Sequence, residues 1–103
     1  GAGNPKPVFA HRNLLFLSAK ILGKSGNAIR FTVADEQQKR WEMMYFGDRI
    51  AFEDYVVSKY SQKQLENLYE GRGEGVRLHV IYDPGIHIWQ GKARLQLVMR
   101  NYQ

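Results

Sequence analysis

The sequence predicts a small, mainly β domain in which five strands close into a barrel and a helical insert separates the third strand from the fourth. Three observations lead to this class. The chain has 103 residues, of which 44% are hydrophobic and 24% charged, which is typical of a single globular domain with one core. Much of the chain alternates apolar and polar residues with the period of a β-strand. Only residues 48–70 show helical spacing instead.

Three strands are expected in the first half of the chain. Residues 14–22 are apolar and compatible with a strand, and residues 28–34 alternate between an apolar and a polar side. Residues 40–46 form the third expected strand. The Gly/Ser/Asn cluster at 23–27 and the polar segment at 35–39 are short enough for hairpin turns, so an antiparallel meander follows.

A helical insert is expected after the third strand. Asp48 can cap the first helix, and Ser61 starts a second short helix with Gln64 at the position typical of a capping box. The glycine-rich residues 71–75 lack the Lys-Ser/Thr of a phosphate-binding loop and are interpreted as a connector. Within this connector, Arg72 is a minor candidate for a phosphate contact.

Two further strands are expected at residues 76–82 and 93–102. Asp83-Pro84-Gly85 predicts a turn or a bulge between them, because proline cannot donate to a hydrogen-bonded ladder. Residues 86–93 then predict a projecting hairpin or an extended loop. Along the last strand, one side is expected to carry the apolar residues Leu95, Leu97 and Met99.

The order of these elements indicates a named fold. A short meander that cannot cover both of its faces must curl around its apolar side and close. A five-stranded Greek-key barrel with a helix between the third and fourth strands is the OB-fold, whose sheet face and loops bind single strands or oligosaccharides. We expect residues 14–103 to form this domain and residues 1–13 to be a linker or an N-terminal extension.

The charge is unevenly distributed along the chain. The net charge is +5, but residues 48–70 hold three cations against five carboxylates, whereas the rest holds twelve against five. This basic remainder is a candidate surface for a polyanion, the alternative being a well-solvated basic protein. The absence of cysteine excludes disulfides, thiolate metal sites and cysteine nucleophiles. No apolar run is long enough to span a bilayer or to act as a signal peptide, so we expect a cytoplasmic domain without a membrane partner.

Four strings of residues resemble one known family. Residues 3–9 (GNPKPVF) are similar to the segment that follows the DHH and DHH-associated domains in the RecJ family, the single-strand-specific 5′→3′ DNA exonucleases of bacteria. Residues 30–35 (RFTVAD) and 44–47 (MYFG) resemble the second and third strands of that family's OB domain. Residues 86–97 resemble its I-N-x-W/Y-x-G-x-x-x-L-Q-L hairpin, although His and Ile stand where the family usually shows Asn and an acidic residue. The strings occur in the family's order over nearly the whole chain.

The resemblance implies a binding module of a larger nuclease. Such a module would bind single-stranded DNA and guide the strand to a catalytic core in the DHH and DHH-associated domains of the same polypeptide, outside this chain. Mg²⁺ or Mn²⁺ is implied for that parent nuclease, and no cofactor is expected in this chain. The alternative is an interaction or structural domain, in which residues 48–70 dock on the nuclease core or on a repair partner. An oligosaccharide-binding module is disfavoured by the basic charge.

Cations and aromatic rings are the candidate binding residues. Sequence-tolerant binding of a single strand needs cations along the phosphates and flat rings on which bases stack. The candidates are Arg30, Lys39, Arg40, Tyr45, Arg77, His79, His87, Trp89, Lys92 and Arg94, with Arg100 as a further cation on the last strand. Packing inside the barrel is the alternative for Tyr45 and for Trp41. Trp89 is expected to be exposed at a loop tip, because it lies in a turn-rich segment next to Gly91.

Catalytic and metal-binding residues are not expected. His79, Asp83 and His87 are four residues apart and could share one side of a straight strand, but Pro84 interrupts it and no fourth ligand is evident. The adjacent carboxylate pairs at 35–36 and 53–54 are expected to be solvated. The sequence therefore supports binding rather than catalysis within the chain.

Overall fold

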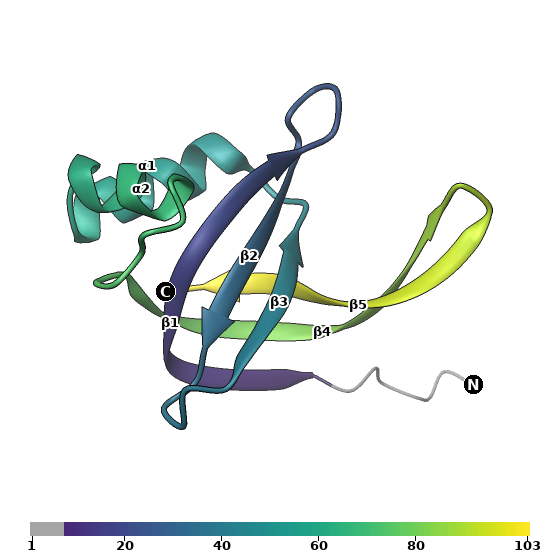
Figure 1. Ribbon diagram of the computed structural model, residues 1–103, viewed down its shortest axis with the longest axis horizontal. Helices are drawn as coiled ribbons and strands as arrows, with labels where there is room; N and C mark the ends of the chain where they lie inside the picture. The colour runs from purple at the N-terminus through teal and green to yellow at the C-terminus, as the bar shows by residue number, and fades with distance from the viewer. Residues whose placement is uncertain (1–7) are drawn as a thin grey trace.

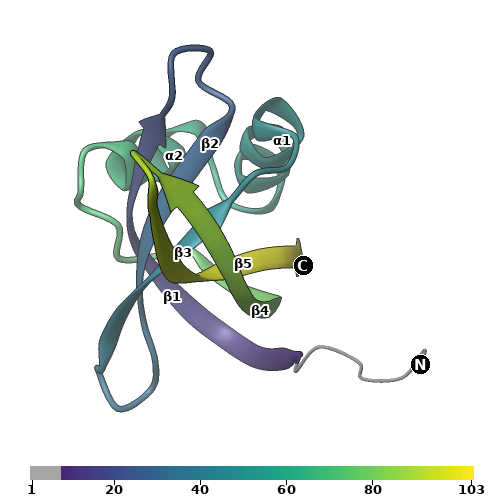
Figure 2. The same cartoon turned by 90° about the vertical axis from the view of Figure 1, so that its right-hand side faces the viewer.

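A computed structural model describes residues 8–103, without the side chains of His87 and Trp89. The chain forms five strands and two helices, in the order β1 (Phe9–Leu22), β2 (Ala28–Ala34), β3 (Arg40–Tyr45), α1 (Arg49–Lys59), α2 (Gln62–Tyr69), β4 (Arg77–Trp89) and β5 (Lys92–Tyr102). The strands close into one barrel in the order β1-β2-β3-β5-β4 (Figures 1 and 2). The predicted OB-fold barrel, with its helical insert between the third and fourth strands, is confirmed.

Strand β1 is bent and pairs with two different neighbours. Its first part runs antiparallel to β4, from Phe9↔Tyr82 to Leu15↔Arg77, and its second part runs antiparallel to β2. The bend coincides with a bulge, because β1 advances three residues between His11 and Leu14 while β4 advances only two. The expected first strand began at residue 14, so the structure moves its start to Phe9. Residues 9–13 are thus part of the barrel wall.

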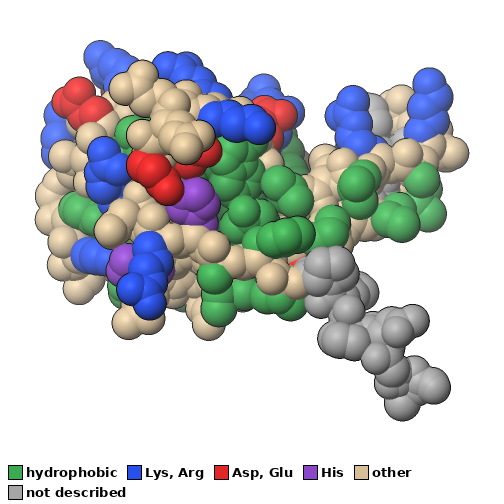
Figure 3. All heavy atoms as spheres, turned by 90° about the horizontal axis from the view of Figure 1, so that it is seen from below, with side chains coloured by type: hydrophobic (Ala, Val, Ile, Leu, Met, Phe, Trp, Pro, Cys, Tyr) green, Lys and Arg blue, Asp and Glu red, His purple; other side chains and the backbone are tan. Residues whose placement is uncertain are grey.

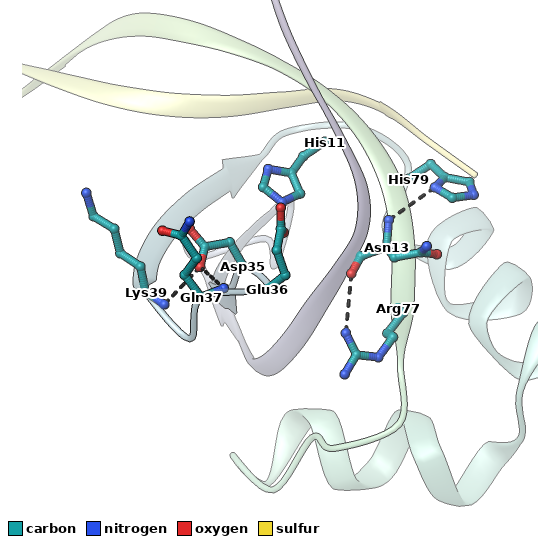
Figure 4. Close-up of polar contacts among 8 residues, drawn as sticks. All are labelled: His11, Asn13, Asp35, Glu36, Gln37, Lys39, Arg77 and His79. Carbon is teal, nitrogen blue, oxygen red and sulfur yellow. Dashed lines mark hydrogen bonds and ion pairs between the residues drawn. The ribbon is translucent and has the colours of Figure 1, made fainter.

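Asn13 lies in this bulge with a φ of 55°, in the left-handed region. Its backbone N–H donates to Nδ1 of His79 at 3.2 Å, and its carbonyl accepts from the Arg77 guanidinium at 3.4 Å (Figure 4). Asparagine tolerates this backbone conformation better than most residues other than glycine. The bulge is therefore tied to β4 through side chains of β4 and the backbone of β1.

The helical insert covers one end of the barrel. Asp48 and Ser61 cap α1 and α2, as expected, by accepting hydrogen bonds from the N–H groups of Ala51 and Gln64. The apolar side chains of both helices are buried in the core, namely Phe52, Val56, Leu65 and Leu68. None of the helices among the described residues is long and apolar enough to cross a membrane.

Aromatic rings fill the barrel beneath α1. Phe31 contacts Phe16 and Phe52, with ring centroids 4.9 Å and 5.1 Å away. Tyr102 packs against Phe52 and Tyr45 at the same end, and its burial raises its pKa to about 12. The alternation predicted for residues 28–34 is confirmed, because the side chains of Ile29, Phe31 and Val33 are all buried in this core.

The connector after α2 contains a glycine that the fold requires. Gly73 is buried, its N–H donates to the carbonyl of Leu17 at 2.8 Å, and a Cβ there would lie 2.4 Å from the carbonyl oxygen of Phe16. Three residues later, the carbonyl of Val76 accepts from the N–H of Phe16 at 2.9 Å. The connector therefore runs closely along β1 before β4 begins.

Strands β4 and β5 extend beyond the barrel as a long hairpin, which we call the arm and define as residues 84–97 (Figure 1). The prediction of a projecting hairpin is confirmed, with a tight turn at Gln90 and Gly91, both at positive φ. The expected interruption at Asp83-Pro84-Gly85 is wrong, because these residues continue β4 and pair with β5. The irregularity lies instead between Ile81 and Tyr82.

One side of the arm is apolar and exposed to solvent. Ile86, Ile88 and Leu95 are 75%, 71% and 71% exposed. Ile86 pairs directly with Leu95, and both continue the side of the hairpin that faces the core near Met99. The alternation that directs Met99 into the core thus continues into the arm, where the corresponding side chains face solvent because the barrel has ended.

We expect the effect of replacing Asn13 on the free energy of unfolding to depend only on its backbone conformation. Both cross-strand hydrogen bonds of Asn13 use its backbone atoms, so a new side chain leaves them in place. Asn13→Gly should leave the free energy of unfolding nearly unchanged, whereas Asn13→Val should lower it by about 1–2 kcal/mol. Urea unfolding measures both, with Arg12→Val as the control at the neighbouring exposed position. Equal stability of Asn13→Val and Asn13→Gly would contradict this account of the bulge.

Candidate functional site

The outer face of β1, β2 and β3 brings two cations together. Lys20 on β1 lies directly opposite Arg30 on β2, and Arg30 in turn pairs with Met44 on β3. Residues that pair directly across strands point to the same side of a sheet. Lys20 was not among the binding residues predicted from the sequence. A tight turn at residues 23–27 pairs Lys20 with Arg30, so the outward position of Arg30 could have indicated that Lys20 also faces outward. Arg40 lies on the same side of β3, four pairs further along.

Arg30 is paired with a carboxylate but stays accessible. Its Nε lies 3.5 Å from Glu42, and the two side chains are 41% and 63% exposed. An exposed pair of this kind contributes little to stability and exchanges readily for another partner. Arg30 can therefore contact a phosphate group without loss of a buried interaction.

A small apolar floor lies beside these cations. Ala28, Met44 and Val98 form a buried cluster on this outer side of the sheet, with Leu22 packed against it. Met44 and Val98 also make the parallel pairing that joins β3 to β5 and closes the barrel. The three cluster residues are only 6–8% exposed, so the apolar surface that this face offers next to its cations is that of the half-buried Leu22.

The arm carries two of the predicted cations, Lys92 and Arg94, and both are exposed. By strand alternation, Arg94 shares its side of β5 with Gln96 and Val98, which is the outer side that holds the apolar floor. Lys and Arg side chains gather at the end of the arm, on a different side from its hydrophobic side chains (Figure 3). The cationic side of the arm therefore continues the outer face of β2 and β3.

Arg100 fixes the base of the arm rather than adding a free charge. Its guanidinium donates to both carboxylate oxygens of Asp83, with N–O distances of 2.9–3.0 Å. Asp83 is 7% exposed, so the carboxylate of this bidentate ion pair is largely removed from water. The cation predicted at Arg100 is thus engaged within the fold.

Lys39 and Arg40 project from the turn between β2 and β3. Asp35 builds this turn, because its Oδ1 accepts from the N–H groups of Gln37 and Lys39, both at 2.9 Å (Figure 4). Both cations are exposed. The neighbouring Glu36 has a pKa below its usual range, owing to a backbone hydrogen bond and to the bond from His11. The turn therefore holds two cations at the far end of β3 from the apolar floor.

Arg77 and His79 lie on a different part of the surface. Both are exposed, but they flank the bulge at Asn13 where β1 pairs with β4 (Figure 4). Their strand β4 is separated from β2 by β1 on one side and by β5 and β3 on the other. The structure therefore does not bring these two predicted residues together with Lys20 and Arg30.

The predicted aromatic residues have different outcomes. Tyr45 belongs to the buried core and contacts Phe52 and Tyr102, so the prediction that its ring is available for stacking is wrong. Trp41 is half-buried against Tyr82, with ring centroids 5.0 Å apart. The side chains of His87 and Trp89 lie outside the described residues, so their predicted contacts remain predictions.

No metal-binding group forms among the described side chains. Within that part of the chain, no three His, Asp or Glu side chains are placed to hold an ion. Of the three residues considered from the sequence, Asp83 binds Arg100 and the Nδ1 of His79 accepts from Asn13. Both groups therefore have structural partners.

Comparisons with known proteins agree with the observed fold. The model of a family described as the RecJ OB domain matches residues 1–101. No curated protein matches the sequence. Among solved structures, two crystal forms of Rim1, a mitochondrial single-stranded DNA binding protein from S. cerevisiae, have a similar fold. Form 2 gives a TM-score of 0.55 at 9% identity over 96% of this chain and 92% of that chain. Form 1 gives 0.52 at 11% identity over 96% and 95%. At these identities the likeness concerns the fold alone.

The Arg100–Asp83 and Arg30–Glu42 ion pairs should contribute differently to the free energy of unfolding. Arg100→Ala leaves the buried Asp83 without its bidentate partner and should lower the free energy of unfolding by about 2–3 kcal/mol. Arg30→Ala removes an exposed pair and should change it by less than about 0.5 kcal/mol. Thermal and urea unfolding of both variants test this, and a smaller loss for Arg100→Ala than for Arg30→Ala would contradict it.

Proposed function

The chain belongs to the RecJ OB domain family, and from this we propose that it is the single-stranded DNA-binding module of a RecJ-like 5′→3′ exonuclease. In this proposal the module binds the strand and guides it toward the DHH and DHH-associated domains of such an enzyme. Hydrolysis and the Mg²⁺ or Mn²⁺ ions it uses belong to those domains. The family match and the fold shared with a single-stranded DNA binding protein support the proposal.

The observation that carries the proposal is the outer face of β1, β2 and β3. It places Lys20 and Arg30 side by side near the half-buried Leu22, which packs on the buried apolar floor at Met44 and Val98. Single strands need both features, because their phosphates attract cations and their unpaired bases seek apolar or aromatic surfaces. OB-folds use this face of strands 2 and 3, together with the β1–β2 and β4–β5 loops, for such ligands.

The elements that flank this face support the same function. The β1–β2 loop at residues 23–27 carries the exposed Lys24, and the arm carries Lys92 and Arg94. In Figure 1 the loop lies beyond the upper ends of β1 and β2, and the arm extends to the right of β3. A strand laid across the face of β2 and β3 would meet cations from the sheet, the loop and the arm. A duplex keeps its base faces stacked inside and would use only the cations.

We expect the purified domain to bind single-stranded DNA weakly and in preference to duplex DNA. A labelled oligothymidine should bind with a micromolar or weaker Kd, and the affinity should fall between ~50 and ~200 mM salt as counterions are released. Fluorescence anisotropy with matched single-stranded and duplex probes measures this. Affinity that is independent of salt, or equal for the duplex, would contradict the proposal.

Single substitutions locate the binding surface. Lys20→Ala and Arg30→Ala should each weaken binding about three- to ten-fold and reduce the salt slope by about one. Lys63→Ala makes the same change of charge on α2, away from this face, and serves as the matched control. Loss of binding in the control alone would place the surface on the helices.

A further inference from the structure

We infer that Arg49 is a positioning residue for the proposed DNA interface, because it fastens the β1–β2 loop to the helical insert. The inference rests on the proposed function, since it assigns a task to a loop that flanks the binding face. Arg49 is the first residue of α1, and the loop it reaches lies between β1 and β2. Sequence analysis gave it no role.

The Arg49 guanidinium holds two acceptors at once. Its Nε donates to the carbonyl of Gly26 in the loop at 3.1 Å, and its NH1 donates to Glu53, one helical turn along α1, at 3.1 Å. The two side chains are only 31% and 20% exposed. Arginine suits this place because its planar fork presents donors in two fixed directions.

A second helix holds the carboxylate that orients Arg49. The hydroxyl of Tyr69 on α2 donates to the same Oε2 of Glu53 at 2.6 Å. Burial and this hydrogen bond raise the pKa of Tyr69 well above its usual range, so the hydroxyl remains a donor. The loop is therefore connected through Arg49 to α1 and through Glu53 to α2.

The loop itself has little internal structure to hold it. Gly23 and Gly26 have φ values of 87° and 66°, and the N–H of Gly26 donates to the carbonyl of Gly23 at 3.2 Å. Glycines in such conformations leave a chain free to adopt many others. The contact with Arg49 restricts Gly26 and hence the exposed Lys24 two residues earlier in the same loop.

Arg49 is placed to hold the loop rather than to bind a phosphate. Two of its donors already have partners, and Glu53 balances its charge. A residue that contacts a phosphate contributes to the salt dependence of binding, whereas a residue that only positions the loop does not. The two roles are therefore separable by experiment.

The test uses one substitution at Arg49 that keeps the charge and one that removes it. Arg49→Lys retains the cation but cannot hold Gly26 and Glu53 together, and it should weaken oligothymidine binding about three- to ten-fold. Arg49→Gln also removes the charge, and it should weaken binding with an unchanged salt slope, whereas loss of a phosphate contact would lower the slope by about one. Amide hydrogen exchange in residues 23–27 should become faster. Tyr69→Phe, which changes no charge, should shift both measurements in the same direction by a smaller factor. Arg12→Lys is the matched control, because Arg12 is exposed on β1 and belongs neither to residues 23–27 nor to the candidate binding residues.

The outcomes separate this inference from the proposed function. If the unchanged domain binds and Arg49→Lys binds equally well, or if Arg49→Gln loses about one unit of salt slope, the positioning role is wrong and the proposed function stands. If the unchanged domain does not bind a single strand at low salt, the proposed function fails and the role of Arg49 at the interface fails with it. Unchanged exchange in residues 23–27 of Arg49→Lys would overturn the anchoring itself.

Discussion

The bend in β1 is the feature on which the rest of the structure depends. One strand serves two neighbours, β4 from Phe9 to Leu15 and β2 from Leu15 to Leu22, and this sharing closes the barrel on one side. On the other side, the parallel pairing of Met44 with Val98 joins β3 to β5. A closed sheet has no long unpaired edges within the barrel, and its interior needs only one cover, which the two helices supply.

Closure also decides which side chains are available to a ligand. Within the barrel every second residue is committed to the core, so the alternate residues alone face outward. This rule sends Tyr45 inside and places Lys20, Arg30 and Met44 on one outer surface. Where β4 and β5 extend beyond the barrel, the residues that continue its core-facing side, Ile86 and Leu95, are exposed to solvent. The arm is therefore apolar on one side and cationic on the other.

Much of the fold follows from local pattern. Alternation at residues 28–34 and the caps at Asp48 and Ser61 depend on neighbours in sequence, and they were predicted correctly. The same alternation, applied to residues 40–46, groups Tyr45 with the buried Met43, so its burial could have been predicted as well.

Other features depend on partners that a sequence does not reveal. Residues 9–13 show no alternation and become a strand only because β4 lies beside them. Pro84 is tolerated within β4 because, among residues 8–103, the pairing with β1 ends at Tyr82, which leaves an edge that needs no donor. The separation of Arg77 and His79 from Arg30 is likewise a consequence of closure. The cations on the outer face follow from strand register, which the hairpin turn at 23–27 sets.

The location of the DNA-binding surface is the central claim, and an NMR titration tests it most directly. Oligothymidine is added to the ¹⁵N-labelled domain at low salt, and the backbone amide shifts are followed. We predict the largest changes at Lys20, Arg30, Met44 and Arg94, with the helices α1 and α2 unaffected beyond their first turn. Changes concentrated at Arg77 and His79, or along α2, would contradict the account.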